Sequence, residues 1–282
     1  MKVSILTENI VYKRGYIGEH GLSLFIEHDN LNYLFDTGQS SVFTRNAHKM
    51  KINLKKLDGI ILSHGHYDHC NGLEEWLKEE KELTQQGMEN PRIPIYINEK
   101  AFQPKYTGIG ENRREIGITW KLEDWKDKLN LTQSGLTQIA ENVYLLSQIS
   151  YVTEFEPKSD LFFKEEIKGI PISDDMEEEQ LLIIKTEKGL NVFAGCAHPG
   201  IINCVSAVQR AFPEERIYSL IGGMHLLRSH KLRVENTIKV LDKLGIEIIV
   251  PLHCTGMLAI AAMKEALGER CILGETGKRI IL

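Results

Sequence analysis

The sequence has no concentrated positive charge and no long apolar run. Its 282 residues carry a formal net charge of -5, without a run rich in lysine or arginine. A protein that binds a nucleic acid backbone needs a basic surface, so we expect no nucleic acid partner. The first apolar stretch, residues 3–6, is too short for a signal-peptide core or a membrane span. We therefore expect a cytoplasmic protein with no membrane partner.

Cysteine is scarce, and its spacing does not favour disulfides. The five cysteines are Cys70, Cys196, Cys204, Cys254 and Cys271. Their number is odd and no C-x-x-C pair occurs, so a disulfide framework is not expected. Three of them lie one or two residues from a histidine, which places thiols beside imidazoles in the chain.

The distribution of apolar residues predicts an α/β protein. The 42% hydrophobic and 26% charged residues are typical of a globular chain, and the length suits one large domain, residues 1–282. Strand candidates alternate with helical patterns at both ends, and a polar turn at Asp29-Asn30 separates two early strands. Residues 85–179 mix charged and proline-containing stretches, so we predict an insertion or cap there.

The most specific motif is H-G-H-Y-D-H, which follows the apolar strand candidate at residues 59–63. It supplies His64, His66, Asp68 and His69, and imidazoles with a carboxylate are ligands that Zn²⁺ prefers. Alternate spacing lets His64 and His66 face one metal, while the other two residues face a neighbouring metal. We therefore predict a two-metal site; the alternative is a polar loop in which histidines cluster without function.

The six-residue motif is too short to complete the coordination of two metals, so further ligands must come from distant parts of the chain. Three later histidines each follow an apolar strand candidate: His198 in G-C-A-H-P-G, His225 in G-G-M-H-L and His253 in P-L-H-C-T-G. We expect the ends of these strands to contribute to the site.

H-x-H-x-D-H after a strand, with single histidines at later strand ends, resembles the metallo-β-lactamase superfamily. The resemblance covers most of the chain and implies an αββα sandwich, in which two mixed β-sheets are flanked by helices and the metals lie at the sheet edges. E-H-G-L-S at residues 19–23, D-T-G at residues 36–38 and the three later histidine motifs resemble a narrower branch of metal-dependent hydrolases. That branch includes a dihydropteroate-synthase-like enzyme of the methanopterin pathway.

The superfamily pattern implies which residues bind each metal. It puts His64, His66 and a later histidine on the first metal, and Asp68, His69 and His253 on the second. No histidine lies between His69 and His198, so the usual ligand from that region is absent, and we assign His198 to its place. This assignment departs from the common pattern.

Four further residues have expected roles. Cys196 follows the strand where a bridging aspartate is usual, and it is either a thiolate ligand or a buried small residue. His225 follows Gly222-Gly223 and either binds metal, orients a substrate phosphate or donates a proton. His20 is expected to line the substrate pocket, with a structural role as the alternative. Asp36 is expected to orient a metal-binding histidine or the loop that carries it.

These assignments predict hydrolysis of an ester or phosphoester in a small molecule. Two metal ions, zinc by preference with iron or manganese as alternatives, lower the pKa of a shared water. Asp68 would orient the attacking water as well as bind metal. His225 would protonate or hydrogen-bond the leaving group.

Three other functions stay open. The branch resemblance implies a transferase that joins a pterin alcohol, or its diphosphate, to an aromatic amine, with Tyr106, Trp120 and Phe155 as candidates for the pterin pocket. The same histidines would also suit a mononuclear iron dioxygenase. A non-catalytic metal-binding protein is disfavoured, because six or seven candidate ligands exceed the four of a structural zinc.

Overall fold

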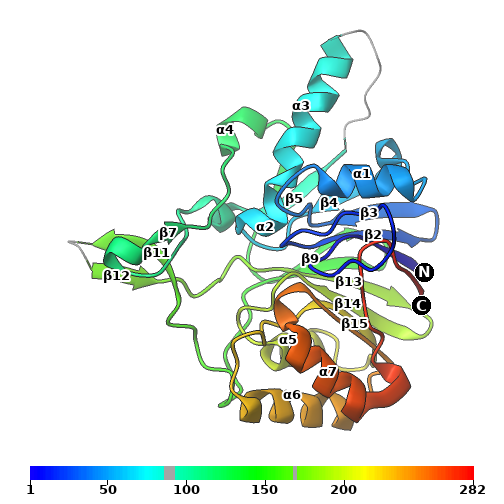
Figure 1. Cartoon of the computed structure of the whole chain (residues 1–282), viewed down its shortest axis with the longest axis vertical. Helices are drawn as coiled ribbons and strands as arrows, with labels where there is room; N and C mark the ends of the chain where they lie inside the picture. Colours follow the sequence, from blue (N-terminus) through cyan, green and yellow to red (C-terminus); the bar gives the residue numbers. More distant parts are fainter. Residues whose placement is uncertain (86–92, 168–169) are drawn as a thin grey trace. The chain divides into compact units, whose positions relative to one another are not determined.

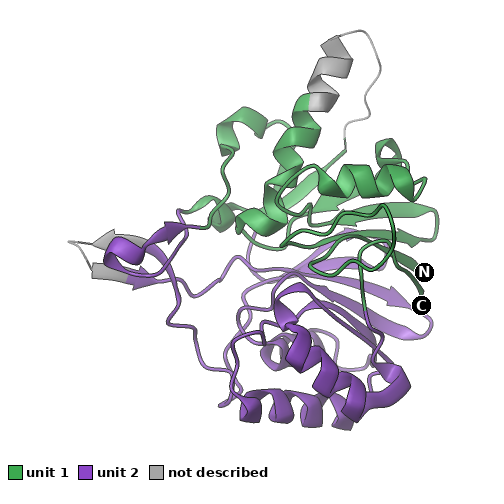
Figure 2. Ribbon diagram, in the orientation of Figure 1, with its two compact units in different colours: residues 1–103, 116–132, 274–282 green, residues 104–115, 133–273 purple. Residues whose placement is uncertain are grey.

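The computed structural model describes residues 1–85, 93–167 and 170–282. It divides into two compact units, drawn in two colours in Figure 2. Unit 1 comprises residues 1–103, 116–132 and 274–282, and unit 2 comprises residues 104–115 and 133–273. One domain over residues 1–282 stays a prediction, as does an insertion at 85–179, part of which lies outside the described residues.

Unit 1 is built on a seven-stranded mixed sheet with the order β17-β1-β2-β3-β4-β5-β8. Its strands are β1 Lys2–Thr7, β2 Ser23–His28, β3 Leu31–Phe35, β4 Gly59–Ile61, β5 Ile95–Asn98, β8 Leu129–Thr132 and β17 Arg279–Ile281. Neighbours are antiparallel from β17 to β3 and parallel from β3 to β8. The turn between β2 and β3 has positive φ at Asp29 and Asn30, as a tight hairpin turn requires, so the predicted turn is confirmed.

Helices pack on this sheet through apolar residues at helical spacing. They are α1 Val42–Lys49, α2 Tyr67–Cys70, α3 Gly72–Gln85 and α4 Leu122–Trp125 (Figure 1). Phe43 and Ala47 of α1 and Trp76 of α3 join Leu34 and Ile60 of the strands in one buried cluster. The short α2 carries much of the histidine motif, so this core fixes where the motif lies.

Unit 2 contains a six-stranded sheet with the order β16-β15-β14-β13-β10-β9. Its strands are β9 Leu136–Ala140, β10 Val143–Leu146, β13 Leu181–Thr186, β14 Gly189–Ala194, β15 Ile217–Gly223 and β16 Ile248–Leu252. Strands β14, β15 and β16 are mutually parallel neighbours, whereas the other pairs are antiparallel. The carboxyl ends of the three parallel strands therefore share one edge, and the three later histidine motifs begin at that edge.

The helices of unit 2 are α5 Ile201–Ala211, α6 Lys231–Lys243 and α7 Met257–Leu267. Val205 and Val208 of α5 and Leu241 of α6 pack with strand residues such as Leu220 in the core of this unit. The apolar runs predicted as strands and the helical spacings predicted as helices in this part of the sequence lie in strands and helices of unit 2.

In the described part of the chain, every helix is too short or too polar to serve as a membrane span. None of the five cysteines takes part in a disulfide.

Unit 2 also carries a small antiparallel sheet with the order β12-β11-β6-β7. Its strands are β6 Tyr106–Thr107, β7 Arg114–Glu115, β11 Phe162–Ile167 and β12 Ile170–Ser173. A buried ion-pair group anchors it: Lys105 Nζ lies 2.7 Å from Asp174 Oδ2 and 2.5 Å from Glu178 Oε1. Burial alone would lower the pKa of the Lys105 ammonium, but the two carboxylates raise it, so this buried lysine stays charged.

Candidate metal centre

The histidine motif of unit 1 gathers three imidazoles. The loop after β4 leads into α2, and His64, His66 and His69 are all buried there. His64 Nε2 lies 3.1 Å from His66 Nδ1, and the ring centroids of His64 and His69 are 4.3 Å apart. Ring nitrogens that converge in a buried place suit a borderline-soft divalent cation.

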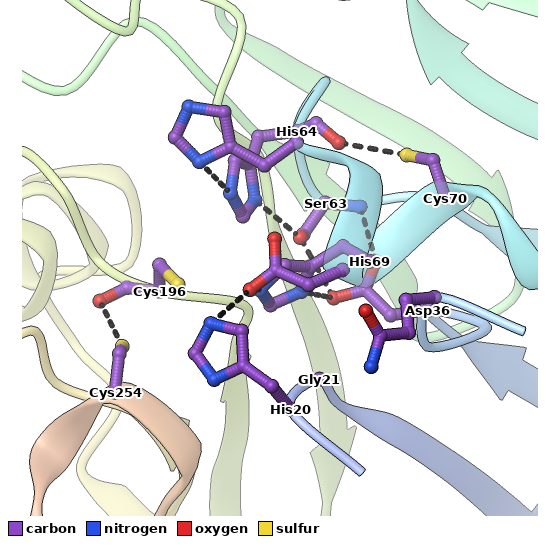
Figure 3. Close-up of polar contacts among 12 residues, drawn as sticks. His20, Gly21, Asp36, Ser63, His64, His69, Cys70, Cys196 and Cys254 are labelled. Atoms are coloured by element: carbon purple, nitrogen blue, oxygen red, sulfur yellow. Dashed lines mark hydrogen bonds and ion pairs between the residues drawn. The ribbon is translucent and has the colours of Figure 1, made fainter. Parts of the chain in front are cut away.

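Backbone contacts hold this loop. The Thr37 N–H donates to the carbonyl of His69 at 2.8 Å. The Cys70 thiol donates to the carbonyl of His64 at 2.9 Å (Figure 3). Gly72 begins α3 where a Cβ would lie 2.2 Å from the carbonyl oxygen of Thr37. Glycine is therefore needed there, because any side chain would displace the backbone that carries the motif.

Asp36, at the end of β3, accepts three hydrogen bonds within the motif. The backbone N–H of Ser63 donates to Oδ1 at 2.7 Å and the Ser63 hydroxyl to Oδ2 at 2.8 Å. His69 Nδ1 lies 2.7 Å from the same Oδ2 (Figure 3). The expected contact between Asp36 and a histidine of the motif is confirmed. The contact favours the Nδ1–H tautomer of His69, and the opposite nitrogen, Nε2, lies 3.9 Å from Asp68 Oδ2.

Asp68 pairs with the exposed His20. The distance from His20 Nε2 to Asp68 Oδ2 is 3.1 Å, and the His20 side chain is 50% exposed whereas Asp68 is buried. Asn9 holds the other ring nitrogen of His20 at 3.2 Å. Gly21 brings this segment close, since a Cβ there would lie 2.5 Å from the carbonyl oxygen of Asp68. A solvent-facing imidazole thus reaches a buried carboxylate of the motif.

The second group of candidate residues occupies the shared strand edge of unit 2. Here Ala197, His225 and His253 have φ angles of +55°, +48° and +49°. Residues other than glycine rarely adopt this left-handed conformation, which costs on the order of 1–3 kcal/mol and gathers at functional sites. The fold therefore maintains strained turns at the three strand ends that carry the later histidine motifs.

Two of these histidines contact each other and a phenylalanine. The ring centroids of His198 and His225 are 4.4 Å apart. Phe162, at the start of β11 in the small sheet, lies 4.8 Å from the His198 ring and 5.6 Å from the His225 ring, between centroids. Nδ1 of His225 is buried and has no hydrogen-bond partner among the described residues. This nitrogen is therefore free to contact a ligand.

Cys254 lies beside Cys196 and His225 in unit 2. The Cys254 thiol donates to the carbonyl of Cys196 at 3.5 Å and accepts the His225 N–H at 3.3 Å. One ligand atom from each of the three residues lies within 4.8 Å of the others. Burial would raise the pKa of Cys254, but hydrogen bonding with Cys196 and His225 and the nearby His253 hold that pKa well below its usual value.

Cys254 and the loop after β14 lie so close to position 223 that this position needs glycine. A Cβ at Gly223 would lie 2.3 Å from the Gly195 carbonyl oxygen and 2.7 Å from the Cys254 sulfur. The interpretation of Gly222-Gly223 as a point of close backbone approach is therefore confirmed.

Glu179 is the residue of this region that the sequence pattern did not single out. Its carboxylate is buried and accepts the backbone N–H groups of Cys196, Ala197 and His198. Burial raises the pKa of Glu179 to about 8. In the sequence it ends the acidic run Glu177–Glu179, which is typical of a solvated surface. Ser63 and Phe162 were missed as well, because neither residue type marks a site on its own.

The predicted residues thus fall into two groups, each assembled within its own unit. Unit 1 brings His20, His64, His66, Asp68 and His69 together, and unit 2 brings Cys196, His198 and His225 together, with His253 at the same strand edge. Their roles as ligands, catalytic groups or substrate contacts stay predictions.

Comparison with known proteins gives consistent matches. The family model of the metallo-beta-lactamase superfamily matches residues 16–84, the stretch that contains the histidine motif. A relative from Methanocaldococcus jannaschii, named 7,8-dihydropterin-6-methyl-4-(beta-D-ribofuranosyl)-aminobenzene-5'-phosphate synthase, is 31% identical over 95% of this chain and 92% of its own length. An uncharacterized protein of the same organism is 29% identical over 99% of both chains.

A solved structure supports the same relationship. A protein described as a metal-dependent hydrolase of the beta-lactamase superfamily is 30% identical, covers 100% of this chain and 99% of its own, and has a TM-score of 0.80. The likeness at this level confirms the predicted fold class. The chain belongs to the metallo-β-lactamase superfamily.

Proposed function

We propose that this protein is a metal-dependent hydrolase that uses a metal-activated water on an ester or phosphoester of a small molecule. The observation that carries the proposal is the buried group of three imidazoles in the H-G-H-Y-D-H motif, with Asp68 beside it. Asp36 contacts Nδ1 of His69, and the opposite ring nitrogen, Nε2, lies on the side of the Asp68 carboxylate. Such a donor set fits a divalent metal better than it fits a packing role.

The proposed ligands follow the superfamily pattern. They would be His64, His66 and His198 for one ion, and Asp68, His69 and His253 for the second, with Cys196 as a further thiolate ligand. Zinc suits these nitrogen, oxygen and sulfur donors, and iron or manganese are the alternatives. When bound, the metal would supply the positive charge that polarises the attacking water and the scissile bond.

Three side chains of the chain itself would handle protons and substrate. Asp68 is proposed to orient the attacking water and accept a proton. His20, whose Nε2 lies 3.1 Å from Asp68 Oδ2, is proposed to contact substrate, and its 50% exposed side chain supports this role. The Nδ1 of His225, without a partner in the described part of the chain, is proposed to hydrogen-bond or protonate the leaving oxygen. Its neighbour Phe162 would then face the same substrate.

Hydrolysis of chromogenic esters, phosphomonoesters and phosphodiesters by the zinc-loaded protein tests this proposal. Removing a general acid or base lowers kcat by about 10²–10⁴-fold, so we expect Asp68→Asn and His225→Gln to fall in that range. The expected split is a large loss in kcat with a smaller change in KM. Equal turnover by wild type and His225→Gln would remove His225 from the mechanism, and no metal-dependent turnover on any of the esters would count against hydrolysis.

A pterin-linked transferase is the alternative, and the name of the 31% identical relative favours it. Two of the three aromatic residues expected for a pterin pocket do not support it, while the third, Tyr106, is half-buried and its ring centroid lies 3.6 Å from the Arg113 guanidinium carbon. Trp120 is 4% exposed, packs in the core of unit 1 and donates its indole N–H to the carbonyl of Cys70, because its large apolar ring completes that core. Phe155 packs against the core of unit 2.

Quenching of pterin fluorescence on binding, lost in Phe162→Ala, would favour the transferase over the hydrolase. A mononuclear iron dioxygenase and a closed, non-catalytic metal site are weaker alternatives that metal analysis separates. We propose a cytoplasmic location, since free thiols suit a reducing compartment, and a small molecule as the partner, with no nucleic acid or membrane involved.

A further inference from the structure

The loop that follows β14 is bound to a single buried carboxylate. Glu179 is 1% exposed and lies two residues before β13. Its Oε1 accepts the N–H of Ala197 at 2.5 Å and of Cys196 at 3.2 Å, and its Oε2 accepts the N–H of His198 at 2.7 Å. Three successive backbone donors of the loop therefore share one acceptor group.

The conformation of the loop explains this arrangement. Ala197 adopts φ +55°, in the left-handed region, and a left-handed residue within a turn lets successive N–H groups converge into a concave anion-binding nest. Without the carboxylate, these buried N–H groups would lose their acceptor, and an orphaned buried donor is destabilising. Glu179 and the strained turn therefore stabilise each other.

The position of Glu179 is itself fixed from two directions. Glu178, the preceding residue, is 2.5 Å from the buried Lys105 ammonium through Oε1. The following strand, β13, pairs with β14, and β14 leads directly into the loop. Glu179 is thus a rigid support for the loop rather than a mobile side chain.

We propose that Glu179 is the positioning residue that holds Cys196 and His198 in the conformation in which they bind metal. The inference rests on the proposed function, because it requires the loop to supply metal ligands. Its physical basis is that a ligating side chain keeps its geometry only if its backbone is held. Here the backbone N–H groups of both residues are held by one carboxylate.

The experiment measures zinc affinity by competition with a chromogenic chelator, and the visible spectrum of the cobalt-substituted protein, for wild type, Glu179→Gln and Glu179→Ala. Loss of a group that supports a metal ligand typically weakens metal binding about 10–100-fold. We expect Glu179→Ala to show such a loss and a changed cobalt spectrum. Glutamine keeps the shape and one acceptor oxygen, so Glu179→Gln should recover part of the affinity.

Glu156→Gln is the matched control. Glu156 is also fully buried and also accepts backbone N–H groups, those of Ile202 and Asn203 at the start of α5, but none from the loop residues 196–198 in the described structure. We expect this variant to lose thermal stability while it keeps wild-type zinc affinity and cobalt spectrum.

Two results would overturn the inference alone: wild-type affinity and spectrum in Glu179→Ala, or equal losses of affinity in the Glu179 variants and in Glu156→Gln. Failure of the wild type itself to bind metal would overturn the proposed function and this inference together. The two failures are therefore distinguishable.

Discussion

Replacing Asp36 with asparagine removes a buried carboxylate beside the histidine motif and nearly keeps the size of the side chain. Asp36 has φ +58°, and asparagine is among the residues that adopt this conformation most readily, so the backbone strain is unchanged. The carboxylate accepts the Ser63 N–H, the Ser63 hydroxyl and the His69 Nδ1–H. Asparagine keeps one acceptor oxygen, but its amide nitrogen is a donor and cannot accept from His69 or Ser63.

The expected losses of unfolding free energy and of zinc affinity follow from these contacts. A hydrogen bond to a charged group contributes about 1.5–3 kcal/mol, so the metal-free Asp36→Asn protein should lose about that much unfolding free energy. His69 would also lose the group that fixes its proton and ring orientation, which typically weakens metal binding about 10–100-fold. That range equals about 1.4–2.7 kcal/mol of binding free energy.

Zinc competition and denaturant unfolding of the metal-free protein measure the two effects separately. Asn46→Ala is the control, because it removes buried hydrogen bonds to the backbone of Leu6 and Ile17 in the same unit and leaves the contacts of the histidine motif intact, so its zinc affinity should stay close to wild type. Wild-type zinc affinity in Asp36→Asn would refute the idea that Asp36 supports a metal ligand. A similar loss of affinity in Asn46→Ala would show that the effect does not pass through His69.

Three further predictions concern unit 2. Lys105→Met leaves the carboxylates of Asp174 and Glu178 buried without their cation, so unfolding in denaturant should show a loss of about 3–5 kcal/mol; a loss below 1 kcal/mol would contradict this. Burial raises the folded-state pKa of Glu156 above 4.5, so the native state holds that proton more tightly than the unfolded chain does. The resulting stability is present below pH 4.5 and is lost as pH rises through the raised pKa, so Glu156→Gln should flatten the dependence of unfolding free energy on pH above 4.5, and an unchanged slope would argue against it. Phe162→Ala removes the ring that contacts two imidazoles, and we expect steady-state kinetics to show a raised KM with a smaller change in kcat; unchanged KM would place Phe162 away from the substrate.

The sequence predicted those parts of the fold that depend on local periodicity. The hairpin at Asp29-Asn30 and the strands that end at His198, His225 and His253 all formed where apolar runs and turn residues indicated them. The clustering of the imidazoles of H-G-H-Y-D-H could also be predicted from the sequence, because residues at this spacing after one strand lie close together.

Other features depend on contacts between residues far apart in the chain. Glu179 resembles a solvated acid in sequence, and only the pairing of β13 with β14 and the burial of Glu178 beside Lys105 place it under the loop at His198. The small sheet that delivers Phe162 is formed by pairing β6 with β11, and neither short strand carries a strong pattern of its own. Trp120 was expected in a pocket but lies in a core, because an aromatic ring suits both and sequence does not distinguish them.

The central claim is that this chain binds metal through the predicted ligands. Elemental analysis of protein purified without chelator tests it most directly, with His64→Ala and His198→Ala measured beside wild type. The account predicts about two zinc ions per chain in wild type and fewer in both variants. One iron per chain would favour the dioxygenase, and a folded wild type without any metal would contradict the account.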